Sequence, residues 1–564
     1  MKVVFVGINA KFSHTNIAIR YLNNELKDMV DSSFEEFTIN EPLEKIVYEL
    51  HKKDADVLMF STYIWNIDYV RKVITSLKKI KPSYTIVLGG PEVSFEKESF
   101  LRANPACDYI IYGEGERAMK EFILYKQGEL SIDEVHNLAY INDNRYIKTE
   151  EAPLIDMNDL SFPYEDEEAL EHRTLYYEAQ RGCPYRCSFC LSSAIKGLRY
   201  KPIDLVKKDL DRLIAMKPSI VKFIDRTFNS NEDFAINIIE HILENNKTNT
   251  KFHFEITLDR MSDRFYETLK KLPKDMVQFE IGLQSINPQT LKAIQRHNDL
   301  ERIKEHSQMI KELGTIHQHI DLIAGLPYED FESFKESFNY LYDFKIEKIQ
   351  LGFLKMLKGS LVRSQEEAFG YKYTDYAPYE VLKNEFLSTD EIIELKKIDY
   401  VVDKIYNEGS FKRTLEILER VYTSSFAMFE DLANFIDENY GLDKTIKKEN
   451  LYRLVYEFIK AKNILSDELV KALSLDYALN VKSQAPLDFM PFTKLRGDKL
   501  HSILRDEVFR KTYLWKYIEE KNKDIVNKVA IILMDGAAYL VDEDVERISD
   551  DYVQRYNLYK HRSV

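Results

Sequence analysis

The chain contains two stretches in which short apolar segments alternate with helical segments, and this alternation restricts the possible folds more than any other feature. In the first stretch, the apolar segments Lys2–Gly7, Asp56–Ser61, Tyr84–Leu88 and Tyr109–Tyr112 have the length of strands. Apolar strands separated by helices are typical of a parallel sheet that is covered on both faces. We expect a doubly wound, Rossmann-like α/β domain over residues 1–135, with a ligand site at the carboxyl ends of its strands.

The alternation restarts near residue 174 with a different spacing. About six strand–helix units fit before residue 360, whereas a complete eight-fold barrel usually needs about 250 residues. We therefore expect a partial (β/α)6 TIM barrel over residues 171–365, joined to the first domain by a linker over 136–170. The expected strands are Leu175–Gln180, Ile220–Ile224, Lys251–Thr257, Met276–Gly282, His317–Ile323 and Lys348–Phe353.

The last part of the chain has a mainly helical pattern. Glu391–Tyr406 carries apolar residues at helical spacing, and Gly409 is a stop signal after it. Asp535-Gly536 lies between two strand-like segments, which is a strong hairpin signal. We expect a mainly helical domain over residues 366–564 with a small β element, and no motif connects it to a particular chemistry.

Charge and hydropathy limit the partners of the chain. Lys and Arg total 79 against 94 Asp and Glu, so the formal net charge is −15. This balance disfavours a large nucleic-acid footprint or an anionic membrane surface as partner. No apolar run reaches the roughly 18 residues that span a bilayer, and the N-terminal apolar segment is too short for a secretory signal. Only 4 cysteines are present, too few for a disulfide-stapled secreted protein of this size, so we expect a cytoplasmic location.

Three of the cysteines form a compact motif in the segment Arg181–Cys190, which reads R-G-C-P-Y-R-C-S-F-C. The C-x₃-C-x₂-C spacing directly follows the first strand of the second stretch, where a barrel enzyme has its active site. Three thiolates on one loop can bind three irons of a [4Fe–4S] cluster and leave the fourth iron open. A structural zinc site, which would need a further ligand such as His172 or His253, and free buried thiols are the alternatives. The remaining cysteine, Cys107, is expected to be a small buried hydrophobe.

Cys183, Cys187 and Cys190, with Phe189 before the last, resemble the signature of the radical S-adenosylmethionine (SAM) superfamily. In that family the open iron binds the amino and carboxylate groups of SAM, and electron transfer cleaves SAM to methionine and a 5′-deoxyadenosyl radical. Later segments are similar, in order, to further family motifs. Phe223–Asn229 is similar to a Gly-Gly-Glu element, although the glycines are absent here, and His253–Glu255 is similar to a third-strand element. Two more elements, Ile281–Asn287 with Arg296 and Asp321–Pro327, resemble those of the coproporphyrinogen-dehydrogenase and methylthiotransferase branch.

The resemblance implies a set of SAM contacts at the strand ends. Oxygens of Glu255, Gln284 and Asp321 can accept hydrogen bonds from the ammonium and ribose groups of SAM, and Arg296 can pair with its carboxylate. For any one of these residues by itself, a surface or helix-capping position is the alternative. The implied SAM-binding residues are Phe189, Asp225, Arg226, Glu255, Gln284, Ser285, Arg296 and Asp321.

The first domain resembles the cobalamin-binding domain that precedes the barrel in B12-dependent radical SAM enzymes. Glycines at strand ends let the backbone approach a large flat ligand, although a nucleotide-binding or ligand-free scaffold would have similar glycines. Tyr63 and Trp65 could cover the corrin, with simple packing as the alternative. The implied cobalamin-binding residues are Asn9, Phe12, His14, Ser61, Thr62, Tyr63, Gly89, Gly90, Pro91, Glu92, Gly113, Glu114 and Gly115.

One departure from the cobalamin pattern concerns the loop after the first strand. Cobalamin domains of the methionine-synthase type carry D-x-H-x-x-G there, and the His ligates cobalt from below. The comparable loop, Phe12–Ile17, keeps His14 but lacks the Asp and the Gly. Without that carboxylate the imidazole lacks its usual tautomer-fixing partner. Because radical SAM members commonly leave the lower face unligated, we interpret His14 as a pocket residue, with direct ligation as the alternative.

Asn9–His14 and Gln350–Gly359 resemble a bacterial subgroup of cobalamin-binding radical SAM proteins with an uncharacterised C-terminal domain. The resemblance implies a [4Fe–4S] cluster, SAM and cobalamin as cofactors and an electron donor such as flavodoxin or ferredoxin. The implied reaction is methylation of an unactivated carbon in a small-molecule or peptide substrate. A non-methylating rearrangement or redox step, and a non-catalytic zinc- or nucleotide-binding protein, are the alternatives. Methylthiotransferase activity is disfavoured because the first domain lacks the cysteines of an auxiliary cluster.

Overall fold

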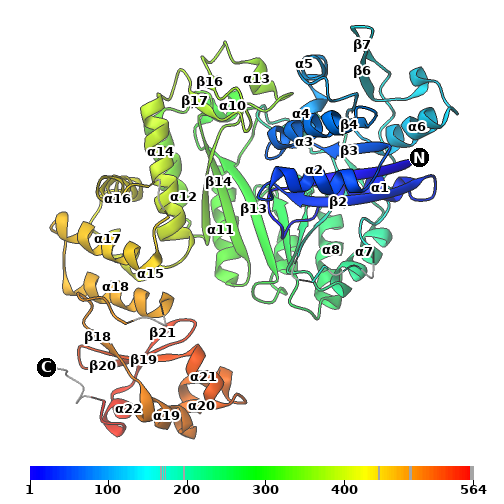
Figure 1. Cartoon of the computed structure of the whole chain (residues 1–564). Coiled ribbons are helices and arrows are strands. Elements are labelled where there is room, and N and C mark those ends of the chain that lie inside the picture. The colour runs from blue at the N-terminus through cyan, green and yellow to red at the C-terminus, as the bar shows by residue number, and fades with distance from the viewer. Residues whose placement is uncertain are drawn as a thin grey trace. The chain divides into compact units, whose positions relative to one another are not determined.

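The computed structural model describes residues 1–165, 168, 170–171, 173–194, 197–442, 445–481 and 485–558. The chain divides into two compact units (Figure 1). One unit consists of Met1–Ile346 with Gln350–Ile392, and the other of Glu347–Ile349 with Ile393–Val564. The first two expected domains therefore lie in one unit, apart from Glu347–Ile349. Among the described residues, no helix combines the length and the apolar character needed to cross a membrane.

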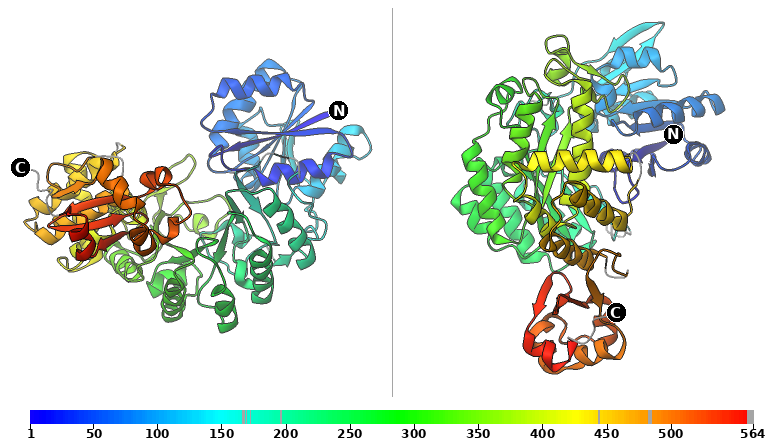
Figure 2. Two further views of the ribbon diagram at one scale, coloured as in Figure 1. Left: turned by 90° about the horizontal axis from the view of Figure 1, so that it is seen from below. Right: turned by 90° about the vertical axis from the view of Figure 1, so that its left-hand side faces the viewer.

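The first domain is a seven-stranded sheet of order β2-β1-β3-β4-β5-β6-β7, covered by helices on both faces (Figures 1 and 2). Strands β1 to β5 pair in parallel, and the antiparallel hairpin β6–β7 extends the sheet beyond them. The predicted doubly wound fold is confirmed. The elements are β1 (Lys2–Asn9), α1 (Ile17–Leu26), β2 (Asp31–Thr38), α2 (Leu43–Lys52), β3 (Val57–Ser61), α3 (Ile67–Ile80), β4 (Thr85–Gly89), α4 (Pro91–Ser94), α5 (Lys97–Ala103), β5 (Tyr109–Ile111), α6 (Glu116–Gln127), β6 (Leu138–Asn142) and β7 (Arg145–Lys148).

Strand β1 shows why the sheet is buried on both faces. Val4, Val6 and Ile8 belong to the hydrophobic core on one face, whereas Val3 and Phe5 belong to the core on the other. Successive side chains of a strand point to opposite faces, so a strand without polar alternation needs helices on both sides. The sheet order reverses between β1 and β3, and this topological switch point is where open α/β sheets bind ligands.

The second domain is a six-stranded sheet of order β15-β14-β13-β12-β11-β8. The edge strands β8 and β15 stand at opposite ends of this order and do not pair with each other. The sheet is therefore an open partial barrel, as predicted. All six expected strands and the six helices between them are present. The elements are β8 (Thr174–Tyr177), β9 (Gln180–Arg181), β10 (Arg199–Tyr200), α7 (Ile203–Ala215), β11 (Ile220–Phe223), α8 (Glu232–Asn245), β12 (Lys251–Ile256), α9 (Asp263–Leu269), β13 (Val277–Gln284), α10 (Pro288–Ala293), α11 (Leu300–Leu313), β14 (His317–Ala324), α12 (Phe331–Tyr342) and β15 (Lys348–Phe353).

The two faces of this sheet have different chemistry. On the helix-covered face, Tyr177 of β8 donates a hydrogen bond to Asp209 of α7 at 2.9 Å, and its ring packs against the buried Phe223. The inner face, in contrast, carries polar residues in register across neighbouring strands. A complete barrel fills its interior with apolar side chains, so a polar inner face is suited to a polar ligand. The aligned inner residues include Tyr176, Lys222, His253 and Gln278, followed by Glu255, Glu280 and His319.

The segment that follows β15 stays with the first unit as far as Ile392. It contains α13 (Leu361–Ser364), β16 (Lys372–Tyr373) and β17 (Val381–Lys383), the last two forming an antiparallel pair. We call residues 354–385 the strap.

The second unit is mainly helical with one small antiparallel sheet of order β18-β19-β20-β21, as predicted. A helix ends near Gly409, whose φ is +66°, and Asp535 and Gly536 form the expected hairpin turn with φ values of 52° and 77°. The elements are α14 (Thr389–Val401), continued by a π-helical turn (Val402–Asn407), then α15 (Lys412–Leu418), α16 (Ser425–Asn439), α17 (Lys448–Ala461), α18 (Asp467–Asn480), β18 (Phe492–Lys494), α19 (Gly497–Arg505), α20 (Glu507–Tyr513), α21 (Asn522–Lys528), β19 (Ala530–Met534), β20 (Ala537–Val541), β21 (Val545–Ile548) and α22 (Asp550–Arg555).

Candidate active site

The cysteine motif lies on a loop that is closed at its base. The short strands β9 and β10 flank the loop and pair antiparallel, with Arg181 opposite Arg199. Gly182 follows β9 with a φ of +94°, and a Cβ at this position would lie 1.9 Å from the carbonyl oxygen of Gly197. The two arms of the loop therefore approach so closely that only glycine fits at position 182.

The three thiols have different surroundings. Cys187 is buried, whereas Cys183 and Cys190 are partly exposed. Burial raises the pKa of Cys187, and the guanidinium of Arg296, which lies 3.6 Å from its Sγ, opposes this rise. Cys183 Sγ lies 3.4 Å from the hydroxyl oxygen of Thr227. A buried thiolate beside a guanidinium is a suitable metal ligand.

The donor set fits a cluster better than a single ion. Among the described residues, no three or more His, Cys, Asp or Glu side chains converge closely enough to surround one metal ion. In a [4Fe–4S] cluster each thiolate binds a different iron, so the three thiols surround the cluster at larger separations than the ligands of a single ion. Of the further zinc ligands considered, His172 lies outside the described residues, and His253 Nε2 lies 2.9 Å from Glu280 Oε2. Cys107 is buried in the core of the first domain and its Sγ donates a hydrogen bond to the carbonyl of Tyr109 at 3.3 Å.

The end of β13 presents an unpaired acceptor. Gln284 has a φ of 71° and is buried, and its Oε1 has no hydrogen-bond partner among the described residues. A Cβ on Gly282 would lie 2.2 Å from Gln284 Nε2, so the amide of Gln284 lies directly over Gly282 and would have to move if this residue carried a side chain. Arg296 donates hydrogen bonds to the carbonyl of Gly282 and, at 3.0 Å, to Asn298 Oδ1. The predicted residues Gln284 and Arg296 thus come together at this strand end, next to Cys187.

The neighbouring Ser285 is fully buried, and its side chain forms a hydrogen bond within the turn that follows β13. Its hydroxyl accepts a hydrogen bond from the amide of Asn287 at 2.9 Å. The fully buried Glu329 lies in the same region, where its Oε1 accepts from Ser337 at 2.7 Å. Ser337 Oγ in turn accepts from the amide of Ile286 at 3.2 Å. Glu329 was not recognisable from the sequence, and burial raises its pKa to about 7.

Asp225 at the end of β11 holds the backbone that leads into the cysteine loop. It is fully buried, and its Oδ1 accepts from the amides of Ala179 and Gln180 at 2.9 and 3.1 Å. Its Oδ2 has no hydrogen-bond partner among the described residues, and burial raises its pKa well above the usual value. The observed contacts of Asp225 are therefore structural, and its predicted role as a SAM contact stays a prediction.

Arg226 and Glu255 form an ion pair beside the cysteines. Arg226 Nη1 lies 3.1 Å from Glu255 Oε1. The charge of Arg226 also acts on Cys183 and Cys190, so these predicted residues of β11, β12 and the cysteine loop are neighbours. Burial raises the pKa of Glu255, and Arg226 opposes this rise. Two further predicted SAM residues are Phe189, which is half-buried in the loop, and Asp321, which lies in register with Gly282.

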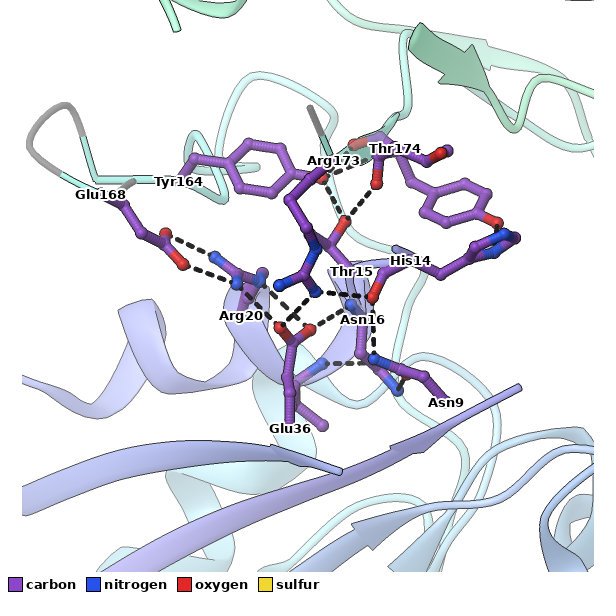
Figure 3. A network of polar contacts seen from close by, with 12 residues as sticks. Asn9, His14, Thr15, Asn16, Arg20, Glu36, Tyr164, Glu168, Arg173 and Thr174 are labelled. Carbon is purple, nitrogen blue, oxygen red and sulfur yellow. Dashed lines mark hydrogen bonds and ion pairs between the residues drawn. The ribbon is translucent and has the colours of Figure 1, made fainter. Parts of the chain in front are cut away.

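At the other side of the site, the switch point of the first sheet carries an amide cluster (Figure 3). Asn16 Nδ2 donates to Ser61 Oγ at 2.9 Å and to Asn9 Oδ1 at 3.3 Å. Asn9 Nδ2 donates to the carbonyl of His14 at 3.1 Å. The predicted residues Asn9, His14 and Ser61 are thus connected. Asn16 was not identified from the sequence, although its position before α1, where its side chain caps the helix, is a recognisable signal.

The same loop and helix α1, which follows it, are anchored to the segment that precedes β8 (Figure 3). Arg20 is buried and pairs with Glu168 at 2.7 Å and with Glu36 at 3.0 Å. Arg173 donates to the carbonyl of His14 at 2.9 Å, and its guanidinium covers the ring of Phe12 at 4.7 Å. Phe12 itself is 76% exposed, so this predicted cobalamin residue presents an apolar surface beside His14.

The ends of β3 and β4 approach each other closely. The amide and hydroxyl of Thr62 both donate to the carbonyl of Gly89 at 2.7 Å. Gly90 has a φ of +108°, and a Cβ there would lie 2.4 Å from the carbonyl oxygen of Thr62. These predicted residues therefore have a demonstrated structural role. Tyr63 stacks on Trp65 with ring centroids 4.3 Å apart, and Trp65 is 44% exposed.

The loop after β4 is covered by the strap. Glu92, which follows Pro91 at the start of α4, is 2% exposed and accepts a hydrogen bond from Tyr379 at 2.7 Å. Lys358 lies 3.6 Å from the same carboxylate. Burial raises the pKa of Glu92, and the contacts with Tyr379 and Lys358 oppose this rise. The strap thus fixes one of the predicted cobalamin segments.

The loop after β5 contacts both strands at the base of the cysteine loop. Arg181 of β9 pairs with Glu116 at 2.6 Å, Glu178 at 2.9 Å and Glu114 at 3.4 Å. Arg199 of β10 pairs with Glu114 as well. We call these five residues the arginine clamp. Gly113, with a φ of +70°, and Gly115 flank Glu114 in this loop. The first domain and the cysteine loop are therefore joined by buried ion pairs.

Fold and site together define a class of protein: a doubly wound ligand-binding domain joined to a partial barrel with three cysteines after its first strand. Family models match the same segments: the B12 binding domain at residues 3–123, the Radical SAM superfamily at 177–341, and a protein family of unknown function, DUF4080, at 367–547. The chain therefore combines a B12-binding domain, a radical SAM domain and a C-terminal domain of unknown function.

Three curated relatives carry methyltransferase names. The chain is 25% identical over 341 residues to 2-(S-pantetheinyl)-carbapenam-3-carboxylate methyltransferase of Streptantibioticus cattleyicolor, covering 56% of this chain and 49% of that protein. It is 25% identical over 312 residues to the cobalamin-dependent radical SAM methyltransferase TokK of Streptomyces tokunonensis, covering 51% and 45%. The chain thus spans about half the length of these relatives. An uncharacterized methyltransferase of Pyrococcus horikoshii is 23% identical over 432 residues, covering 70% and 90%.

Solved structures share the fold. The cobalamin-dependent SAM radical enzyme OxsB, with aqua-cobalamin bound, aligns with a TM-score of 0.61 at 16% identity, covering 85% of this chain and 79% of OxsB. The radical SAM methyltransferase TsrM from Kitasatospora setae, with tryptophan and a SAM analogue bound, aligns with a TM-score of 0.56 at 15% identity, covering 68% and 80%.

Proposed function

We propose that the chain is a cobalamin-dependent radical SAM enzyme that methylates an unactivated carbon of a small-molecule or peptide substrate. The cofactors are a [4Fe–4S] cluster, SAM and cobalamin, and an electron donor such as flavodoxin or ferredoxin reduces the cluster. The observation that carries the proposal is the arginine clamp, because it joins the loop with the three cysteines to the B12-binding domain through Arg181 and Arg199. A cluster loop and a corrin-binding domain need such a fixed relation if both act on one substrate.

The residues present fit the cluster and SAM. Cys183, Cys187 and Cys190 would ligate three irons, and the unpaired Oε1 of Gln284 can accept a hydrogen bond from SAM. When bound, the cluster supplies the electron that cleaves SAM. Arg296 contributes positive charge next to the buried Cys187, and Arg226 does so next to the other two thiols. The contact with Arg296 favours the thiolate form of Cys187, which is the form that binds iron.

The residues at the switch point fit a large ligand with a polar tail. Asn9, Asn16 and Ser61 bring amide and hydroxyl groups together where the sheet order reverses, and the half-exposed Trp65 offers a stacking surface beside Tyr63. When bound, cobalamin supplies the methyl carrier between SAM and the substrate.

The inner face of the barrel supports a polar substrate. Glu280 pairs with His253 at 2.9 Å, and this contact lowers the pKa of Glu280 to about 2, so its carboxylate stays charged. Lys222 lies in register with His253 on the neighbouring strand. Charged and hydrogen-bonding groups inside a barrel orient a polar substrate and disfavour a purely apolar one.

The test is an anaerobic assay of the full chain reconstituted with iron, sulfide and cobalamin. Incubated with SAM and a strong reductant, it is expected to release 5′-deoxyadenosine, and the Cys187→Ala variant is expected to release none. Absence of 5′-deoxyadenosine from the reconstituted wild type would overturn the proposal. With a substrate added, 5′-deoxyadenosine without S-adenosylhomocysteine would replace methyl transfer by a rearrangement or redox step.

A further inference from the structure

His14 occupies a position from which it can reach a ligand at the switch point. It lies between β1 and α1, in a loop whose backbone is tied to Asn9 and Arg173. Its main chain also forms a parallel bridge with Thr174, at the start of β8. The loop is thus fixed from both domains, and the imidazole is only partly buried.

The two ring nitrogens of His14 have different environments. Nδ1 lies 2.6 Å from the hydroxyl oxygen of Tyr176 on the inner face of β8. Nε2 forms no hydrogen bond among the described residues. It is also absent from the buried polar atoms that have no partner, so it is not fully buried. Nε2 is therefore the nitrogen that remains accessible to a ligand.

Tyr176 supplies the partner that the local sequence lacks. A metal on Nε2 requires the proton on Nδ1, and a hydrogen-bond acceptor at Nδ1 fixes that tautomer and the ring orientation. The phenol oxygen of Tyr176 can accept this bond. The two residues are 162 positions apart and belong to different domains, so inspection of the loop alone showed only that the usual carboxylate was missing.

The charges around the ring favour its neutral, metal-binding form. Burial lowers the pKa of His14, and the positive charges of Lys11, Lys222 and Arg173 lower it further. Among the described residues, no carboxylate forms an ion pair with this imidazole.

We propose that His14 ligates the cobalt of bound cobalamin through Nε2, and that Tyr176 is the positioning residue that orients its ring. The inference rests on the proposed cobalamin-dependent function. It reverses the interpretation of His14 as a mere pocket residue, and it makes the cobalt coordination depend on a residue of the barrel.

The test is electron paramagnetic resonance of the full chain loaded with cob(II)alamin. A coordinated nitrogen-14 splits the cobalt lines into three, whereas nitrogen-15 splits them into two. Protein labelled with nitrogen-15 histidine and loaded with unlabelled cobalamin is expected to show the two-line pattern. The His14→Ala variant is expected to bind cobalamin without splitting from a protein nitrogen.

Tyr176→Phe tests the positioning role, and Tyr177→Phe is its matched control because that hydroxyl binds Asp209 on the opposite face of the same strand. Loss of such an outer partner typically weakens metal binding 10–100-fold, so Tyr176→Phe is expected to lower the ratio of ligated to unligated cobalt by roughly that factor. Tyr177→Phe is expected to leave the ratio unchanged.

Each other outcome contradicts a specific statement. If cobalamin binds but the splitting of its cobalt lines is the same with and without the histidine label, ligation by His14 is overturned and the proposed function stays intact. An equal loss of ligation in Tyr176→Phe and Tyr177→Phe overturns the positioning role. Failure of the wild type to bind cobalamin overturns the proposed function and, with it, the inference.

Discussion

At the scale of single residues, the site depends on positions where only one side chain fits. Gly182 has no room for a Cβ because the far arm of the cysteine loop passes against it. At the end of β13, the lack of a side chain on Gly282 leaves space for the amide of Gln284. Gly182 and Gly282 contribute no functional group, but they determine where the thiols and the Gln284 acceptor lie.

We predict that Gly182→Ala prevents cluster assembly. The added Cβ would lie 1.9 Å from the Gly197 carbonyl, so β9 and β10 could not pair. Gly197→Ala is the matched control, since Gly197 also has a positive φ but no atom within 4 Å of an added Cβ; its backbone strain amounts to about 1 kcal/mol. Iron and sulfide per chain are expected to fall at least several-fold in Gly182→Ala only. Equal cluster content in both variants would contradict the steric argument.

Glu329 is predicted to make the stability of the folded unit depend on pH. Burial raises its pKa from the usual 4.5 to about 7, so the folded state binds the proton more tightly than the unfolded state. The stabilisation is present below the unfolded pKa and is lost as pH rises towards 7, by about 3 kcal/mol. Denaturant unfolding at pH 5 and pH 8 measures the loss. Glu329→Gln is expected to remove this part of the pH dependence, and an unchanged slope would contradict the argument.

At the scale of elements, the sequence predicted the strands and helices better than their contacts. The six barrel strands and the Asp535-Gly536 hairpin were recognisable because each depends on local periodicity or turn chemistry. The arginine clamp could not be predicted in this way, because Arg181 meets Glu116 across 65 residues. Glu114 was predicted as a cobalamin residue because it lies in a glycine-rich loop. Its ion pair with Arg199 could not be predicted from the sequence of that loop.

We predict that the arginine clamp is a major contributor to stability. In Arg181→Met, Glu116 and Glu178 would lose a partner that is itself only 13% exposed, and removal of one partner from a buried ion pair costs about 3–5 kcal/mol. Burial raises the pKa of Glu178, so protonation at lower pH relieves the unpaired charge. The loss in unfolding free energy is therefore expected to be smaller at pH 5 than at pH 8.

Arg102→Met is the control for the clamp, because the Arg102–Glu98 pair lies on the surface, with Arg102 43% and Glu98 50% exposed. Exposed pairs contribute about 0–1 kcal/mol. A similar loss of stability in both variants, or a larger loss at pH 5 than at pH 8 for Arg181→Met, would show that the clamp does not act as argued.

At the scale of the whole molecule, one compact unit contains the B12-binding domain, the radical SAM barrel and the strap. The strap covers Glu92 of the first domain, and the clamp connects that domain to the cysteine loop. The match to a family of unknown function begins within the strap, at residue 367, and continues into the second unit. Part of that family's sequence is therefore used to complete the cofactor-binding unit.

The central claim is that this one unit holds an iron–sulfur cluster and a corrin together. The most direct measurement is the content of iron, acid-labile sulfide and corrin in the full chain, purified and reconstituted without oxygen. We predict four irons and four sulfides for each chain, as a [4Fe–4S] cluster requires, together with one corrin. One zinc in place of iron and sulfide, with no bound corrin, would contradict the account.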